Sequence, residues 1–282
     1  MYATVGSANV FYTVAGEGLP CLVPSLAGTP IYERTFTPAL GGALRLIFVE
    51  LRANRTAVGD VSALTLRRLL EDMDGLRRVL GLDTVAVLGH SAHSLLGLAY
   101  ASHFPTHVSH VIVVGGMPRL SPTFSEQRAA YWDVVASPER KERLAENHAA
   151  LTRQGGEHLT PSELLTATYA ADGPIYFFDP AYDCTPLWAG HDQFSDELYQ
   201  RFWGANGQFS TFDPAVSFPR LTAPVFIAHG VFDFSVPPTV WIGIKETLPD
   251  QTYCAFERSG HYPQMEERAT FDAAVDTWLR RA

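Results

Sequence analysis

The chain has 282 residues, of which 46% are hydrophobic and 18% charged, and its formal net charge is −9. A chain of this length forms one large α/β domain or two smaller ones, and the negative charge disfavours nucleic acid as a partner. No apolar stretch reaches transmembrane length and the first residues do not resemble a signal peptide, so we expect a cytoplasmic protein with no membrane partner. The cysteines, Cys21, Cys184 and Cys254, predict neither a disulfide framework nor a metal site.

Short apolar segments alternate with helical ones over the first 116 residues. Strands are predicted at 8–14, 21–23, 44–50, 84–88 and 108–114. Apolar residues recur at helical spacing from Thr65 to Leu80, and a second helix is predicted at 94–101. This alternation favours an α/β fold with a mostly parallel sheet and right-handed crossovers.

The alternation stops between residues 117 and 218, which are helical in pattern and rich in aromatic residues. It resumes with a strand at 224–230, a helix from Trp241 to Leu248, a strand at 252–256 and an amphipathic helix from Glu266 to Arg281. We therefore predict one α/β domain, formed by residues 1–116 and 219–282, with a helical lid inserted at 117–218.

The stretch Gly89-His90-Ser91-Ala92-His93 lies between a predicted strand and a buried helix. Strand, tight turn and helix form the context of a G-x-S-x-G nucleophile elbow, which exposes the serine hydroxyl to a carbonyl carbon. Taken alone, the motif also fits a tight turn with a capping serine. His93 stands where the pattern has glycine, and we expect this change to affect packing more than chemistry. The alternative is that His93 acts as a second base.

A serine nucleophile needs a base and an acid that orients the base. Asp233 follows the predicted strand at 224–230, and His261 follows the one at 252–256. The carboxyl ends of parallel strands are where open α/β sheets place their sites. Singly, Asp233 fits a turn and His261 a surface or capping position. Together with Ser91, in this chain order, they predict a catalytic triad.

With these residues in place, the chain resembles the α/β-hydrolases, in particular their proline-iminopeptidase-like branch. The resemblance covers the core but not the lid, and its motifs are Gly16-Glu17-Gly18, the segment 65–82, Gly89-His90-Ser91, the segment 229–237 and the segment 259–267. It implies the α/β-hydrolase fold and the triad Ser91, Asp233 and His261.

The resemblance also implies an oxyanion hole made by the backbone N–H groups of Ala92 and Leu26. Leu26 takes this place because Pro24-Ser25 stands where the family has His-Gly. A second departure lies at 50–56, which lacks the two glycines of the family pattern. Both departures bear on the substrate more than on hydrolysis itself.

The predicted function is hydrolysis of a small-molecule carboxylic ester, lactone, thioester or amide through an acyl-enzyme. One alternative is a proline iminopeptidase-type aminopeptidase, for which the lid could select a cationic amine. Residues 153–217 contain 2 basic and 9 acidic residues, although such an excess is also typical of a solvated surface. Further alternatives are a cofactor-free lyase or perhydrolase, and a hydrolase-like receptor.

No cofactor and no metal are expected. The sequence contains no glycine-rich phosphate loop. His103, His107 and His110 lie close together, but their spacing matches no metal site. The sequence leaves the oligomeric state open.

Overall fold

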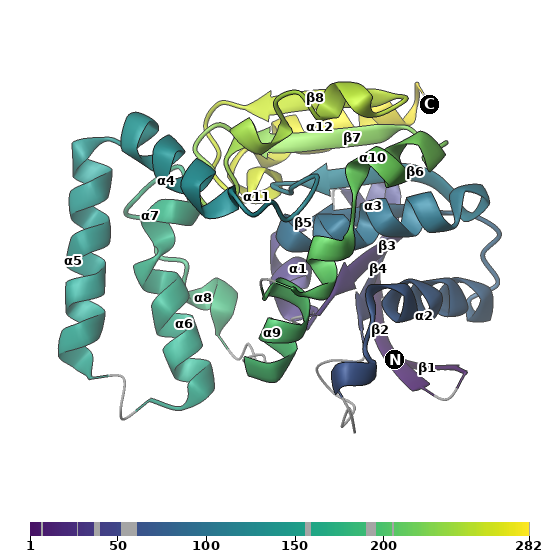
Figure 1. Cartoon of the computed structure of the whole chain (residues 1–282), viewed down its shortest axis with the longest axis horizontal. Coiled ribbons are helices and arrows are strands. Elements are labelled where there is room, and N and C mark those ends of the chain that lie inside the picture. Colours follow the sequence, from purple (N-terminus) through teal and green to yellow (C-terminus); the bar gives the residue numbers. More distant parts are fainter. Residues whose placement is uncertain are drawn as a thin grey trace.

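The fold is that of a computed structural model, which describes residues 1–6, 8–26, 28–36, 40–51, 61–155, 159–189, 196–204 and 206–281. An eight-stranded sheet runs through the molecule in the order β1-β2-β4-β3-β5-β6-β7-β8 (Figure 1). The strands are β1 (Tyr2–Val5), β2 (Ala8–Ala15), β3 (Leu19–Ser25), β4 (Leu44–Glu50), β5 (Val85–His90), β6 (Val108–Val114), β7 (Val225–Gly230) and β8 (Gln251–Phe256).

The sheet is mostly parallel. Strand β2 pairs with β1 and β4 in antiparallel fashion, and every other neighbouring pair is parallel. Strands β5 and β7 are buried along their whole length, as expected where helices cover both faces of a sheet. The predicted α/β fold is confirmed. Strand β1, only four residues long, was not among the predicted strands.

Helices pack on both faces of the sheet and divide the core into two clusters. One cluster holds the apolar faces of α2 (Leu66–Val79) and α3 (Ser94–His103). The other holds those of α1 (Pro30–Thr35) and α12 (Arg268–Leu279), which follows the short α11 (Pro263–Glu266). Helix α2 confirms the periodicity found from Thr65 to Leu80. The Thr65 side chain caps its first turn by accepting the Arg68 N–H.

The prediction of a helix from Trp241 to Leu248 is wrong. Two short 3₁₀ turns, Pro238–Trp241 and Lys245–Thr247, stand in its place. Gly243 has a φ of 74° and so breaks any helix between them. Trp241 is buried and donates its indole N–H to the Gly116 carbonyl oxygen at 2.8 Å.

The described parts of residues 117–218 consist of helices and connecting loops and contain no strand. Their helices are α4 (Phe124–Val135), α5 (Pro138–Gln154), α6 (Pro161–Ala171), α7 (Gly173–Tyr176), α8 (Thr185–Trp188), α9 (Asp196–Trp203) and α10 (Pro214–Ser217). Figure 1 shows α5 and α6 side by side, farthest from the sheet. This arrangement supports our proposal of an inserted lid.

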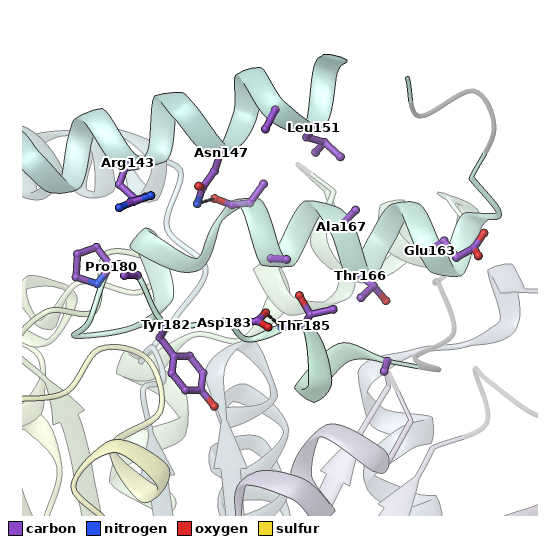
Figure 2. A pocket seen from close by; sticks show the side chains of 15 residues that line it. Arg143, Asn147, Leu151, Glu163, Thr166, Ala167, Pro180, Tyr182, Asp183 and Thr185 are labelled. Carbon is purple, nitrogen blue, oxygen red and sulfur yellow. Dashed lines mark hydrogen bonds between the residues drawn. The ribbon is translucent and has the colours of Figure 1, made fainter. Parts of the chain in front are cut away.

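Within this region, the segment around α9 packs into the core, whereas a cavity lies beside α5 and α6. Leu198, Phe202 and Phe209 are buried in the same core cluster as α2 and α3, so the segment around α9 is part of the main core. A cavity of about 720 Å³ lies instead between α5, α6 and residues 180–185 (Figure 2). Ser91, Asp233 and His261 do not line it. None of the described helices is long and apolar enough to cross a membrane.

Candidate active site

The turn after β5 holds Ser91 in a strained backbone conformation. Its φ is 56°, the only positive φ of a non-glycine residue in the described part of the chain. Such a conformation costs about 1–3 kcal/mol and marks functional turns. Gly89 permits the turn, because a Cβ there would lie 2.5 Å from the Ser94 Cα. Strand, strained serine and helix therefore follow one another as in a nucleophile elbow.

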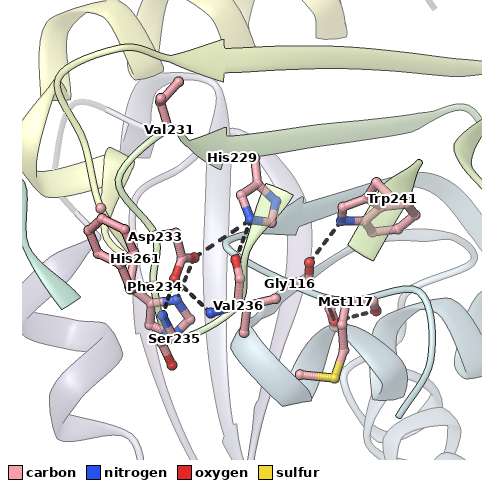
Figure 3. Close-up of polar contacts among 12 residues, drawn as sticks. Gly116, Met117, His229, Val231, Asp233, Phe234, Ser235, Val236, Trp241 and His261 are labelled. Atoms are coloured by element: carbon pink, nitrogen blue, oxygen red, sulfur yellow. Dashed lines mark hydrogen bonds and ion pairs between the residues drawn. The ribbon is translucent and has the colours of Figure 1, made fainter. Parts of the chain in front are cut away.

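Asp233 and His261 meet beyond the ends of β7 and β8 (Figure 3). The His261 Nδ1 lies 2.8 Å from the Asp233 Oδ2, and both side chains are buried. The other carboxylate oxygen of Asp233 accepts the N–H groups of Ser235 at 3.0 Å and Val236 at 2.7 Å. With Nδ1–H donated to the carboxylate, the His261 Nε2 keeps a lone pair and can act as a base.

Burial sets the protonation of this pair. It lowers the pKa of His261 below the usual value of 6.5, so the imidazole is neutral, as a general base requires. Burial also raises the pKa of Asp233, against the opposite effect of His229 and of the N–H groups of Val236 and Ser235. These backbone donors favour the carboxylate form that orients the ring.

Two further histidines hold the loops of the pair. His229 donates from Nε2 to the Val236 carbonyl oxygen at 2.7 Å, beside Asp233. His90 Nε2 lies 2.9 Å from the His261 carbonyl oxygen, to which it donates. The ring centroids of His90 and His261 are 4.6 Å apart, so the residue before Ser91 is in contact with the proposed base.

Gly115, at the end of β6, is a feature of the site that sequence reasoning missed. Its φ is 49°, and a Cβ there would lie 2.7 Å from the His261 carbonyl oxygen and 3.1 Å from its Nδ1. The Gly115-Gly116 pair after a buried strand was visible in the sequence, but only the structure shows that His261 needs its space.

The helical region contacts the site through α7 and the residues after it. The His261 N–H donates to the Tyr176 carbonyl oxygen at 2.6 Å, and the Phe234 N–H to that of Ile175 at 3.2 Å. Glu266 accepts the N–H groups of Phe178 at 2.6 Å and of Gly260 at 2.8 Å. The segment 173–178 is therefore hydrogen-bonded to the loops that carry Asp233 and His261.

A buried arginine fixes this segment from the other side. Arg140, on α5, donates to the carbonyl oxygens of Pro174, Phe177 and Phe178. Its guanidinium also lies 5.2 Å from the centre of the Phe234 ring. A single cation thus links α5, the segment 173–178 and the Asp233 loop.

Comparisons with known proteins agree with this architecture. The alpha/beta hydrolase fold family matches residues 50–268. The chain belongs to this family. It is 27% identical over 277 residues to the AB hydrolase superfamily protein YclE of Bacillus subtilis, covering 96% of this chain and 95% of that protein. It is 26% identical over 230 residues to a proline iminopeptidase of Heyndrickxia coagulans, covering 78% and 75%.

Solved structures show the same fold. The proline iminopeptidase of Mycobacterium smegmatis has a TM-score of 0.76 at 19% identity, covering 100% of this chain and 97% of that one. A meta-cleavage product hydrolase of Pseudomonas fluorescens has a TM-score of 0.71 at 16% identity, with the same coverage.

In this α/β-hydrolase the expected oxyanion loop follows β3. The Leu26 N–H, which the resemblance assigns to the oxyanion, lies 3.1 Å from the His93 Nε2 and donates to it. His93 is buried, and its Nδ1 lies 2.5 Å from the Tyr32 hydroxyl. Gly89 instead provides the close approach of strand and helix that glycine normally provides at this position, because a Cβ on Gly89 would lie 2.5 Å from the Ser94 Cα. The second family departure, at 50–56, lies largely outside the described residues.

Two of the clustered histidines, His107 and His110, have structural contacts. His107 contacts the Asp74 carboxylate at 2.8 Å, and the His110 ring packs on Trp278. In the described part of the chain, no three histidine, cysteine or acidic side chains are grouped as a metal site requires.

Proposed function

We propose that this α/β-hydrolase is a serine hydrolase that forms an acyl-enzyme. Ser91 Oγ attacks a carbonyl carbon while the His261 Nε2 takes the hydroxyl proton, and that proton then passes to the leaving group. Water attacks the acyl-enzyme in the same way and releases the acid. The observation that carries the proposal is the buried 2.8 Å contact between the His261 Nδ1 and Asp233, together with the contact between His261 and His90, the residue before the strained Ser91.

Several described acids between residues 153 and 217 have local partners, in most cases the backbone of the next turn. Each of Asp179, Asp183 and Asp213 accepts the N–H two residues further on, at 2.9–3.0 Å. Glu163 forms a capping box with Thr160, and Asp172 lies 2.7 Å from the His148 Nε2. Carboxylates engaged in this way give little support to an amine-binding surface. We therefore favour a neutral carboxylic ester, lactone or thioester as the substrate.

Aminopeptidase activity is the second candidate, because relatives from several bacteria are named proline iminopeptidases. A panel of p-nitrophenyl esters, lactones and aminoacyl anilides, run on the wild type and on Ser91→Ala, separates the candidates. We expect ester or lactone turnover that Ser91→Ala abolishes. The opposite outcome is a preference for a proline anilide, with a kcat/KM that falls as added salt screens the lid acids. This outcome would favour aminopeptidase activity over ester hydrolysis. A burst without turnover would indicate a receptor.

A further inference from the structure

A chain of hydrogen bonds connects the oxyanion loop to the nucleophile elbow through His93. The Leu26 N–H lies 3.1 Å from the His93 Nε2, the His93 Nδ1 lies 2.5 Å from the Tyr32 hydroxyl, and that hydroxyl lies 3.4 Å from the His90 carbonyl oxygen. Leu26, Tyr32 and His93 are all buried. The four residues come from the β3 loop, α1 and both sides of Ser91.

The two ends of the chain fix the direction of every bond in it. A backbone N–H only donates, so the His93 Nε2 must accept from Leu26. A neutral imidazole then carries its proton on Nδ1 and donates it to the Tyr32 oxygen. The Tyr32 hydroxyl in turn donates to the His90 carbonyl, which only accepts. His93 is thus assigned as the neutral Nδ1–H tautomer.

This assignment gives the Leu26 N–H to His93 in the resting molecule. The family resemblance gives the same N–H to the oxyanion of the reaction. It carries a single hydrogen, which cannot make a full-strength bond to both acceptors. The Trp203 ring meets the His93 ring edge to face at 6.1 Å, so the imidazole is enclosed by protein on this side too.

We propose that His93 is a gate on the oxyanion hole. Its Nε2 withholds the Leu26 N–H in the resting enzyme, and a developing oxyanion must displace the imidazole before it gains this donor. The displacement is feasible because an ionised oxygen is a stronger acceptor than a neutral ring nitrogen. The inference rests on the proposed serine hydrolase. His93 acts through Leu26 and is therefore a positioning residue.

Two substitutions separate the two bonds of the imidazole. The amide of His93→Asn reaches the position of Nδ1 and keeps a partner for Tyr32, but it places no atom at Nε2. The longer amide of His93→Gln places an oxygen near Nε2 and can still accept the Leu26 N–H. We expect His93→Asn to raise kcat/KM for an ester about five- to tenfold, the equivalent of one net hydrogen bond. We expect His93→Gln to stay near the wild type, with both variants folded by circular dichroism.

A readout that does not depend on turnover is the Leu26 amide itself. The dipeptide Ser-Leu occurs only at 25–26 and 94–95. When serine is labelled with ¹³C at the carbonyl and leucine with ¹⁵N, a carbonyl-filtered NMR spectrum therefore shows only two amide signals. The signal that is lost in Leu26→Met belongs to Leu26. We expect this signal to shift in His93→Asn but not in His93→Gln. We also expect it to shift in the wild type when phenylboronic acid forms a tetrahedral anion on the serine.

Three results would overturn the gate. They are a slower His93→Asn with a normal His93→Gln, a Leu26 signal unchanged in His93→Asn, and a boronate adduct that leaves this signal unchanged. The first would mean that the imidazole orients the N–H rather than withholding it. Failure of the serine hydrolase proposal looks different: no boronate adduct and no turnover would be seen, although the Leu26 signal would still move in His93→Asn.

Discussion

Gly115→Ala tests whether the space beside His261 matters to the chemistry. The added Cβ would lie 2.7 Å from the His261 carbonyl oxygen, and ordinary contacts begin at 3.4 Å, so the two must separate by 3.4 − 2.7 = 0.7 Å. A misplacement of about 1 Å at a reacting group costs roughly 10²-fold. We therefore expect kcat to fall about 30- to 100-fold while KM changes little, because the displaced residue is the proposed base and not part of the substrate pocket.

The substitution also has a cost in stability that a control can isolate. A non-glycine residue in the left-handed region loses about 1–2 kcal/mol. Gly81 has a φ of 66° and no atom within 4 Å of its added Cβ, so Gly81→Ala carries the same strain without touching His261. Steady-state kinetics on a p-nitrophenyl ester and urea unfolding would be measured for both variants. Wild-type kcat in Gly115→Ala, with a stability loss equal to that of Gly81→Ala, would refute the reasoning.

Three other outcomes follow from the same contacts. Asp233→Asn should lower kcat by about 10⁴ and leave a residual rate, because the ring loses its orienting acceptor; full activity would show that another residue is the acid. Because burial raises the pKa of Asp233 to about 7 and lowers that of His261, the pair takes up its first proton on the carboxyl group, and kcat/KM for a neutral ester should fall as the pH drops through about 7; an acid limb with the same midpoint in Asp233→Asn would contradict this. Arg140→Met should cost about 3 kcal/mol by removing the donor from two buried carbonyl groups and one partly buried carbonyl group, seen as a lower urea midpoint; an unchanged midpoint would show that these bonds add nothing.

The sequence was sufficient where local pattern and order carry the information. Buried strands of β-branched residues predicted the sheet, and the elbow motif placed Ser91 at the end of β5. The positions of Asp233 and His261 after two later strands led to the prediction that they meet, and they do, at 2.8 Å. Parallel strands bring their carboxyl ends to one edge, so chain order alone was informative there.

The features that escaped prediction depend on residues far apart in the chain. The bond between the Leu26 N–H and His93 joins positions 67 residues apart, and the need for Gly115 arises from a loop at residue 261. The helix predicted from Trp241 failed for a local reason, because Gly243 adopts a positive φ within an otherwise helical pattern. The acidic excess of residues 153–217 could not be interpreted until three of its carboxylates, those of Asp179, Asp183 and Asp213, were seen to accept backbone N–H groups of turns.

The central claim, that Ser91 is an activated nucleophile, is tested most directly by covalent labelling. A fluorophosphonate reacts with an activated serine, and intact mass followed by peptide mapping identifies the residue. We expect a single label on Ser91, lost in Ser91→Ala and slowed in His261→Ala. A label on another serine, or no label on a folded protein, would contradict it.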